Sequence, residues 1–121
     1  MKKFEFKIHG PIKGGKNHIM ITRTGHRYPN PKFAAWRDEV VNGLVPMIGA
    51  YRFDAPVSIK VIYTPFDLKR RDMPAMLDSI FHCMEKAGLI EDDCLVKDLQ
   101  WTARAKDKEN AGVSVFLEDL P

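Results

Sequence analysis

An apolar stripe with helical spacing runs from Met73 to Ala87, and it constrains the fold of this chain more than any other feature. Its side chains recur every three or four residues, so they share one face of a helix that other parts of the chain must cover. The stripe consists of Met73, Met76, Leu77, Ile80, Phe81, Met84 and Ala87. Gly88 follows at once, and glycine commonly ends a helix because it adopts left-handed backbone without strain. We therefore predict a core helix over residues 73–87.

The rest of the chain predicts one more helix and several strands. Asn30 and Pro31 form a helix start, with asparagine as the N-cap and proline in the first turn, and Pro46 and Gly49 close this segment. Strands are expected at residues 4–8, 57–63, 95–105 and 112–117, with a basic hairpin or extended loop across residues 19–28. This order predicts a single α+β domain over residues 1–121, with a mixed sheet of about four to six strands and two main helices.

Charge is divided unevenly along the chain, although the net charge is only +3. Residues 1–37 contain nine Lys or Arg and one acidic residue, whereas residues 72–98 contain seven acidic residues and two lysines. A basic region suits a polyanion such as nucleic acid. A compact acidic segment in the same small domain suits a divalent cation that is held beside phosphate. Charge alone leaves open the alternative that both segments are solvated surfaces of no special function.

Two charged corners flank the predicted helix. Lys69, Arg70, Arg71 and Asp72 precede it, and Glu91, Asp92 and Asp93 follow it. Hydrolysis of a phosphodiester by Mg²⁺ needs two or three carboxylates that converge on the ion. Each corner also has a purely structural interpretation, as a helix N-cap at Asp72 and as an acidic surface turn at the other end. A helix of this length spans about 22 Å, so its two ends meet at one metal only if the chain returns or a second subunit brings the opposite end.

The cysteines and the hydropathy of the chain exclude several classes of protein. Cys83 and Cys94 form no CxxC pair, and together with His82 they match no familiar zinc spacing. No apolar run reaches the roughly 18 residues of a membrane span, and the N-terminus has no continuous apolar core of a signal peptide. We therefore expect reduced thiols and a cytoplasmic protein with no membrane contact and no small-molecule cofactor.

Arg70-Arg71-Asp72, the helix, and the run from Glu85 to Asp93 form a pattern together. RusA-type Holliday junction resolvases have a similar signature region: an Arg/Lys-rich loop, Asp-x-Asp-Asn, a later lysine, a helix that ends in Ala-Gly, and an Asp-Asp pair. The chain resembles this family most strongly from about Lys69 to Asp98. Its basic N-terminal region, with Gly10-Pro11 and a helix around Trp36, is similar more loosely, so the resemblance covers essentially the whole chain.

The resemblance implies a homodimeric, Mg²⁺-dependent endonuclease that binds and cuts branched DNA, with Mn²⁺ as a substitute ion. Asp72 matches the first motif aspartate, and Asp92 and Asp93 match the later pair, so these three are the expected catalytic and metal-binding residues. The chain departs from the motif at four positions: Pro74 replaces the second aspartate, Ala75 the asparagine, Asp78 the lysine, and His82 an acidic residue of the helix. Asp78 is therefore a further candidate metal ligand, as a replacement carboxylate.

Seven basic residues are expected to hold DNA backbones near a branch point, through contacts with phosphates rather than with bases. They are Lys13, Lys16, Arg23, Arg27, Lys69, Arg70 and Arg71. Two other functions remain open. One is a junction-binding protein on the same fold whose site is impaired by the changes at Pro74, Ala75 and Asp78. The other is an unrelated single-strand binder that stacks bases on Tyr28, Trp36 and Trp101.

Overall fold

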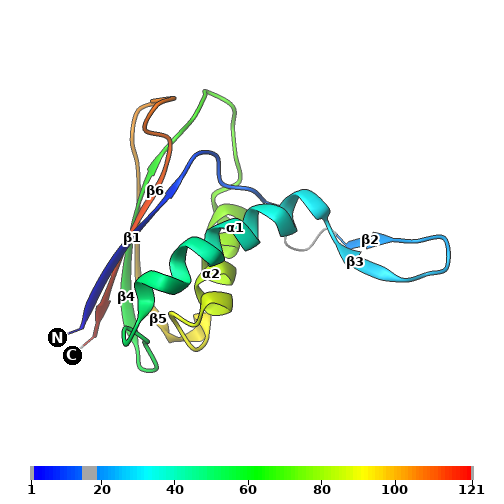
Figure 1. Ribbon diagram of the computed structural model, residues 1–121. Helices are drawn as coiled ribbons and strands as arrows, with labels where there is room; N and C mark the ends of the chain where they lie inside the picture. The colour runs from blue at the N-terminus through cyan, green and yellow to red at the C-terminus, as the bar shows by residue number, and fades with distance from the viewer. Residues whose placement is uncertain (1, 15–18, 121) are drawn as a thin grey trace.

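The computed structural model describes residues 2–14 and 19–120. Its elements are β1 (Lys3–His9), β2 (Ile19–Ile21), β3 (Arg27–Pro29), α1 (Pro31–Ile48), β4 (Val57–Thr64), α2 (Met73–Ala87), the short 3-10 helix η1 (Asp93–Leu95), β5 (Val96–Ala103) and β6 (Gly112–Asp119). A four-stranded mixed sheet forms one layer, and both α-helices lie on one of its faces (Figure 1). The expected α+β class with two main helices is confirmed.

The order of the strands in the sheet differs from their order in the chain. The sheet reads β1-β6-β4-β5, with β6 antiparallel to both of its neighbours and β4 parallel to β5. Helix α2 is the crossover that makes the parallel β4–β5 pair possible, since parallel neighbours need a long connection. The last two strands were expected from the sequence, but they are not neighbours, because the final strand inserts between β1 and β4.

Helix α2 carries the apolar stripe that the sequence predicts, and it supplies the centre of the core. Ile80 and Met84 are fully buried, and Met76 is 4% exposed. They belong to the same core cluster as Ile59 of β4 and Val115 of β6. The helix covers residues 73–87 as predicted, and Gly88 ends it with a φ of +83°. The helix is therefore rigidly placed on the sheet by the burial of its apolar side chains.

Helix α1 begins at the predicted Asn30 cap and ends just before Gly49, the second of the two residues that were expected to close it. The side-chain oxygen of Asn30 accepts hydrogen bonds from the backbone N–H of Lys32 (2.9 Å) and of Phe33 (3.4 Å). Pro46 lies inside the last turn, and the helix ends only at Ile48. Within the described residues no helix is both long and apolar enough to cross a membrane.

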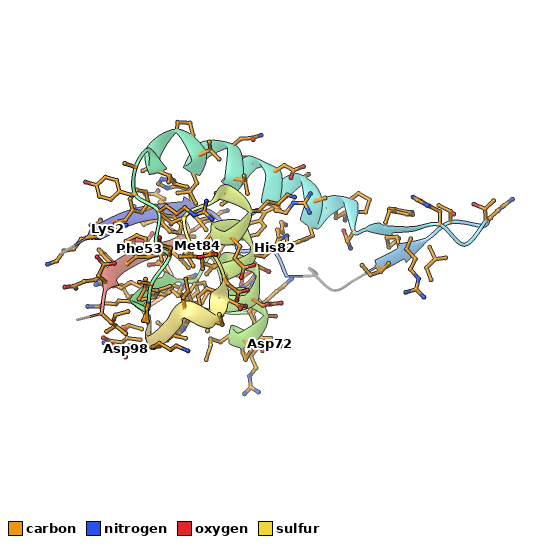
Figure 2. All side chains as sticks on the ribbon, turned by 90° about the horizontal axis from the view of Figure 1, so that it is seen from below. Lys2, Phe53, Asp72, His82, Met84 and Asp98 are labelled. Atoms are coloured by element: carbon orange, nitrogen blue, oxygen red, sulfur yellow. The ribbon has the colours of Figure 1, made fainter. Side chains whose placement is uncertain are left out.

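Strands β2 and β3 pair only with each other, and they form an arm that projects from the end of α1 away from the sheet (Figures 1 and 2). We call residues 19–29 the arm. It corresponds to the basic hairpin that the sequence predicts. A two-stranded hairpin has little surface against which to bury its side chains, and this one leaves Ile19, Met20 and Ile21 exposed.

Candidate metal centre and nucleic-acid interface

The turn after α2 brings the chain back beside the last turn of the helix. Gly88 donates its N–H to the carbonyl oxygen of Glu85 (3.0 Å), and Leu89 donates to that of Met84 (2.9 Å). Phe53 then holds the returning chain, since its N–H donates to the Leu89 carbonyl (2.8 Å) and its carbonyl accepts from Glu91 (3.1 Å). Because Leu89 and Phe53 are buried, this turn is anchored in the core.

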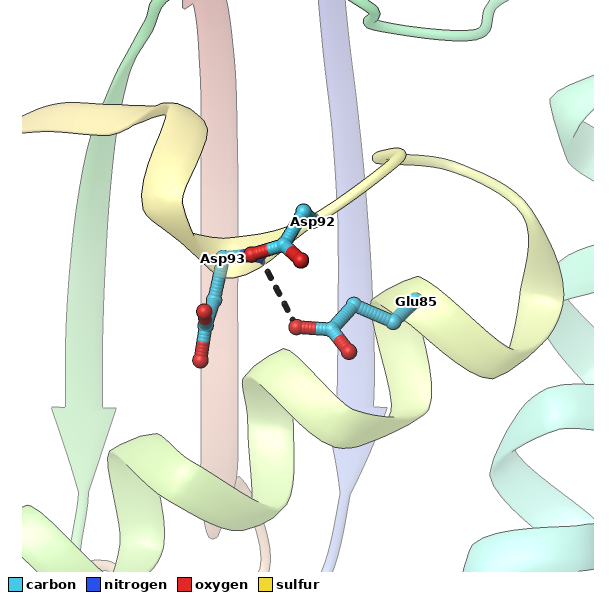
Figure 3. Close-up of side chains that lie close together, drawn as sticks. All are labelled: Glu85, Asp92 and Asp93. Atoms are coloured by element: carbon cyan, nitrogen blue, oxygen red, sulfur yellow. Dashed lines mark hydrogen bonds between the residues drawn. The ribbon is translucent and has the colours of Figure 1, made fainter.

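This turn gathers three carboxylates at one point on the surface. Glu85, Asp92 and Asp93 each offer an oxygen within 4.8 Å of the others (Figure 3). We call them the acidic cluster. The Asp93 N–H donates to Oε1 of Glu85 (2.9 Å), and the Cys94 N–H donates to Oδ1 of Asp92 (2.8 Å). Two of the three carboxylates are therefore oriented by main-chain groups, as the ligands of a metal commonly are.

The electrostatics of the cluster favour a bound cation. The hydrogen bond from the Cys94 backbone holds the pKa of Asp92 below its ordinary value, so this carboxylate stays ionised at neutral pH. Three negative groups at this distance repel one another, and a divalent ion relieves that repulsion. The donors are all hard oxygens, which suit Mg²⁺ or Mn²⁺ and not a thiolate-bound metal. The residues present therefore fit the ion that the sequence analysis expects.

Only part of the expected acidic set comes together. Asp92 and Asp93 lie in the acidic cluster, whereas Asp72 and Asp78 do not belong to it. Asp72, labelled in Figure 2, is the exposed N-cap residue of α2, whereas Glu85 lies in the last turn of this helix of about 22 Å. Asp72 therefore stands at the N-cap position that the structural interpretation expects, but its side chain makes no capping hydrogen bond. Asp78 is half-buried in the middle of the helix.

Glu85 is the member of the cluster that sequence reasoning missed. Glu85 lies outside the apolar stripe of the helix, and the sequence gave no reason to join it with the Asp-Asp pair. The sequence did contain a signal that could have joined Glu85 to the Asp-Asp pair, because Glu85 lies three residues before Gly88. A left-handed glycine at the end of a helix reverses the chain over the last helical turn, where that residue sits.

The expected DNA-contacting residues lie in three separate segments. Lys13 follows β1, Arg23 and Arg27 lie on the arm, and Lys69 and Arg70 lie in the loop before α2, all of them exposed. Lys16 lies outside the described residues. Arg71 differs from the others, because its guanidinium donates to Oδ1 of Asp67 (2.6 Å) and to Oδ2 (3.2 Å). This pairing lowers the pKa of Asp67 to about 2 and uses part of the binding capacity of Arg71.

The two tryptophans argue against a single-strand binder, and the cysteines argue against a zinc site. The ring of Trp36 lies 5.9 Å from that of Phe33, and the ring of Trp101 lies 5.4 Å from that of Tyr63. Both tryptophans are half-buried against the core, so they are poorly placed to stack on bases. Cys83 is fully buried, where burial raises the pKa of its thiol to about 12, and the group of candidate metal ligands found among the described residues contains neither cysteine.

Comparison with known proteins gives one distant relative. The chain is 24% identical over 101 residues to the crossover junction endodeoxyribonuclease RusA of Aquifex aeolicus (strain VF5). The alignment covers 84% of this chain and 79% of that protein. No protein-family model matches the chain. The similarity extends over most of both proteins, and it agrees with a RusA-like resemblance over the chain as a whole.

Proposed function

We propose that this protein is a structure-selective endodeoxyribonuclease that cuts four-way DNA junctions with the help of Mg²⁺. The acidic cluster is the observation that carries the proposal, since it places three carboxylates within 4.8 Å of one another on a turn that is fixed to the core. The distant similarity to a crossover junction endodeoxyribonuclease supports the same reaction. An ion held by Glu85, Asp92 and Asp93 would polarise the scissile phosphate as a Lewis acid.

Residues at both ends of α2 have a role in this proposal. Backbone N–H groups of Asp93 and Cys94 hold the carboxylates of Glu85 and Asp92 in place, and the hydrogen bond from Cys94 lowers the pKa of Asp92. Lys69 and Arg70, at the other end of α2, bind the phosphates of a second stretch of backbone. Contacts of this kind read the shape of a branched duplex and not its base sequence.

Asp72 takes part through a second subunit in this proposal. Its carboxylate and the acidic cluster lie at opposite ends of α2, so one chain does not bring them together. A homodimer in which the two α2 helices lie antiparallel would place Asp72 of one subunit near the cluster of the other. This arrangement would also supply two sites, which the symmetric cutting of a four-way junction requires.

A junction-binding protein with an impaired site is the second candidate. Pro74 favours it, because this residue stands where the resembling family has a metal-binding aspartate, and a proline side chain offers no oxygen. Pro74 is exposed in the first turn of α2, a position that suits proline structurally. The two candidates share the fold and the binding surface, and they differ only in Mg²⁺-dependent cleavage.

Cleavage of a labelled four-way junction in Mg²⁺ or EDTA tests the proposal. We expect paired nicks near the branch point in Mg²⁺ only, and a loss of rate of about a hundredfold or more in Asp93→Asn. Glu109→Gln is the matched control, because Glu109 is an exposed carboxylate in the turn beyond the far end of β5. Tight junction binding without nicks in Mg²⁺ or Mn²⁺ would leave the impaired binder as the function. Equal loss in Asp93→Asn and Glu109→Gln would remove the acidic cluster from the mechanism.

A further inference from the structure

The loop between β4 and α2, residues 65–72, carries the most exposed large apolar side chain of the described residues. Leu68 is 86% exposed, and Ile21, the next in order, is 63% exposed. In the sequence Leu68 stands between Asp67 and the cations Lys69 and Arg70. A single exposed leucine is ordinary on a protein surface. Its exposure alone therefore implies no function, and the structure of the loop is what distinguishes it.

Hydrogen bonds across the loop hold the backbone around Leu68 in one conformation. The guanidinium of Arg71 donates to Oδ1 (2.6 Å) and Oδ2 (3.2 Å) of Asp67. The Lys69 N–H donates to the same Oδ1 (3.0 Å), and its carbonyl accepts from Arg71 (3.4 Å). A guanidinium that engages both oxygens of a carboxylate is geometrically specific. Leu68 is therefore presented to solvent at a defined position.

The turn between β5 and β6 lies against this loop and fixes it to the sheet. The Asp107 N–H donates to the Pro65 carbonyl (3.0 Å). The ammonium group of Lys108 lies 5.5 Å from the centre of the Phe66 ring, which is a cation–π contact. Figure 1 shows the loop and the turn at the same end of the sheet. The two segments therefore form one surface.

This surface is rich in cations that have no acidic partner. Lys69 and Arg70 follow Leu68 in the loop, and Arg104 and Lys106 line a pocket in the adjoining turn. All four are exposed, and none forms an ion pair with another described residue. Cations of this kind bind the phosphates of nucleic acids. An apolar side chain among them meets the part of DNA that lies between its backbones, which is the stack of bases.

A protein partner is the competing contact for Leu68. Protein interfaces bury apolar patches of several side chains, whereas the neighbours of Leu68 in the loop are charged. Some DNA-binding proteins insert a single leucine between two base pairs, with cations on the phosphates beside it. Such insertion costs least where stacking is already interrupted, as it is at a branch point. The surroundings of Leu68 therefore favour branched DNA.

We propose that Leu68 is a wedge that enters the stack of bases at the branch point of a DNA junction. The cations of the loop and of the β5–β6 turn bind the phosphates beside it. This inference rests on the proposed function, because it needs branched DNA as the ligand. It concerns recognition and not cleavage, since Leu68 lies before α2 and the acidic cluster lies at the end of this helix and after it. Leu68 is in this sense a specificity-determining residue.

A four-way junction with 2-aminopurine beside the branch point tests the wedge, because the fluorescence of this base rises when it is unstacked. The protein is added in EDTA and, separately, in Ca²⁺, and a gel confirms that the junction stays intact. We expect a rise of at least about twofold for the unchanged protein and for Leu68→Met, which keeps a large apolar side chain. Leu68→Ser should lose most of this rise. Leu99→Ser is the matched control, because Leu99 is an exposed leucine of β5 (41%).

Affinities for the junction and for a linear duplex separate the wedge from the cations. Leu68→Ser should lower the preference for the junction about tenfold and leave the salt dependence of binding unchanged. The double variant Lys69→Gln, Arg70→Gln should weaken the binding of both DNAs and reduce the salt slope by about one for each cation. Because Leu68 is exposed, the melting temperature of Leu68→Ser should equal that of the unchanged protein.

The wedge and the nuclease fail separately in these experiments. An unchanged affinity and a full fluorescence rise in Leu68→Ser would overturn the wedge, and so would the absence of junction binding by the unchanged protein. Nicks in Mg²⁺ without a fluorescence rise would overturn the wedge and leave the nuclease. A fluorescence rise that depends on Leu68, without nicks in Mg²⁺, would support the wedge and refute the nuclease.

Discussion

Replacement of glycine by alanine at two positions tests how backbone conformation sets the stability of this fold. Gly43 lies inside α1, and Gly88 ends α2 in left-handed backbone with a φ of +83°. An added Cβ meets nothing within 4 Å at either position. The two substitutions therefore make the same chemical change in open space and differ only in backbone conformation. We expect Gly43→Ala to stabilise the protein and Gly88→Ala to destabilise it.

The magnitudes follow from the two conformations. Alanine is favoured over glycine in a helix interior by about 0.8–1 kcal/mol, which is the expected gain at Gly43. Left-handed backbone costs a non-glycine residue roughly 1–2 kcal/mol, which is the expected loss at Gly88. A chain of 121 residues has an unfolding entropy of about 0.25 kcal/mol per kelvin near its melting temperature. The melting temperature should therefore rise by about 4 °C for Gly43→Ala and fall by about 4–8 °C for Gly88→Ala.

Calorimetry of the two variants and of Gly88→Asn measures these shifts. Asparagine tolerates left-handed backbone better than alanine, so Gly88→Asn should recover part of the loss. The turn at Gly88 also returns the chain to Glu85, so Gly88→Ala should weaken Mn²⁺ binding, whereas Gly43→Ala should not. Melting temperatures that change in the same direction in Gly43→Ala and Gly88→Ala would refute the reasoning, since backbone conformation would then not decide the effect of the added methyl group.

Two further predictions concern charged side chains. Glu85→Gln removes one negative charge but keeps an oxygen that accepts from the Asp93 N–H. The variant should therefore bind Mn²⁺ more weakly in a calorimetric titration. In EDTA its melting temperature should be higher than that of the unchanged protein, because the repulsion between carboxylates is reduced. A higher melting temperature of the unchanged protein in EDTA would contradict repulsion within the cluster. Asp67 has its pKa lowered from 3.8 to about 2 by the hydrogen bond from Arg71, so its stabilising effect is present above pH 4 and is lost as the pH falls towards 2. Melting temperatures of the unchanged protein and of Asp67→Asn should therefore differ slightly at pH 6 and converge near pH 2, and a constant difference would contradict this assignment.

The helices and the ends of the helices were determined by the sequence itself. The spacing of the stripe from Met73 to Ala87, the Asn30 cap and the Gly88 stop act within a few residues of chain, so local chemistry is enough to predict them. The identity of the strands was equally local, because alternation along residues 57–63 decides which side chains face the core. The end of α1 was local as well, since the helix runs through Pro46 and ends at Ile48 with Gly49 as its C-cap.

Only the tertiary structure decided which distant residues meet. The insertion of β6 between β1 and β4 depends on strand pairing across the whole chain, which no local pattern encodes. The same holds for the site. Asp92 and Asp93 could be named from the sequence, but the turn anchored by Phe53 gives them Glu85 as a neighbour and leaves Asp72 at the far end of α2. Burial and long-range hydrogen bonds decide which residues lie close together in space. The sequence alone specifies which residues can take part in such a site.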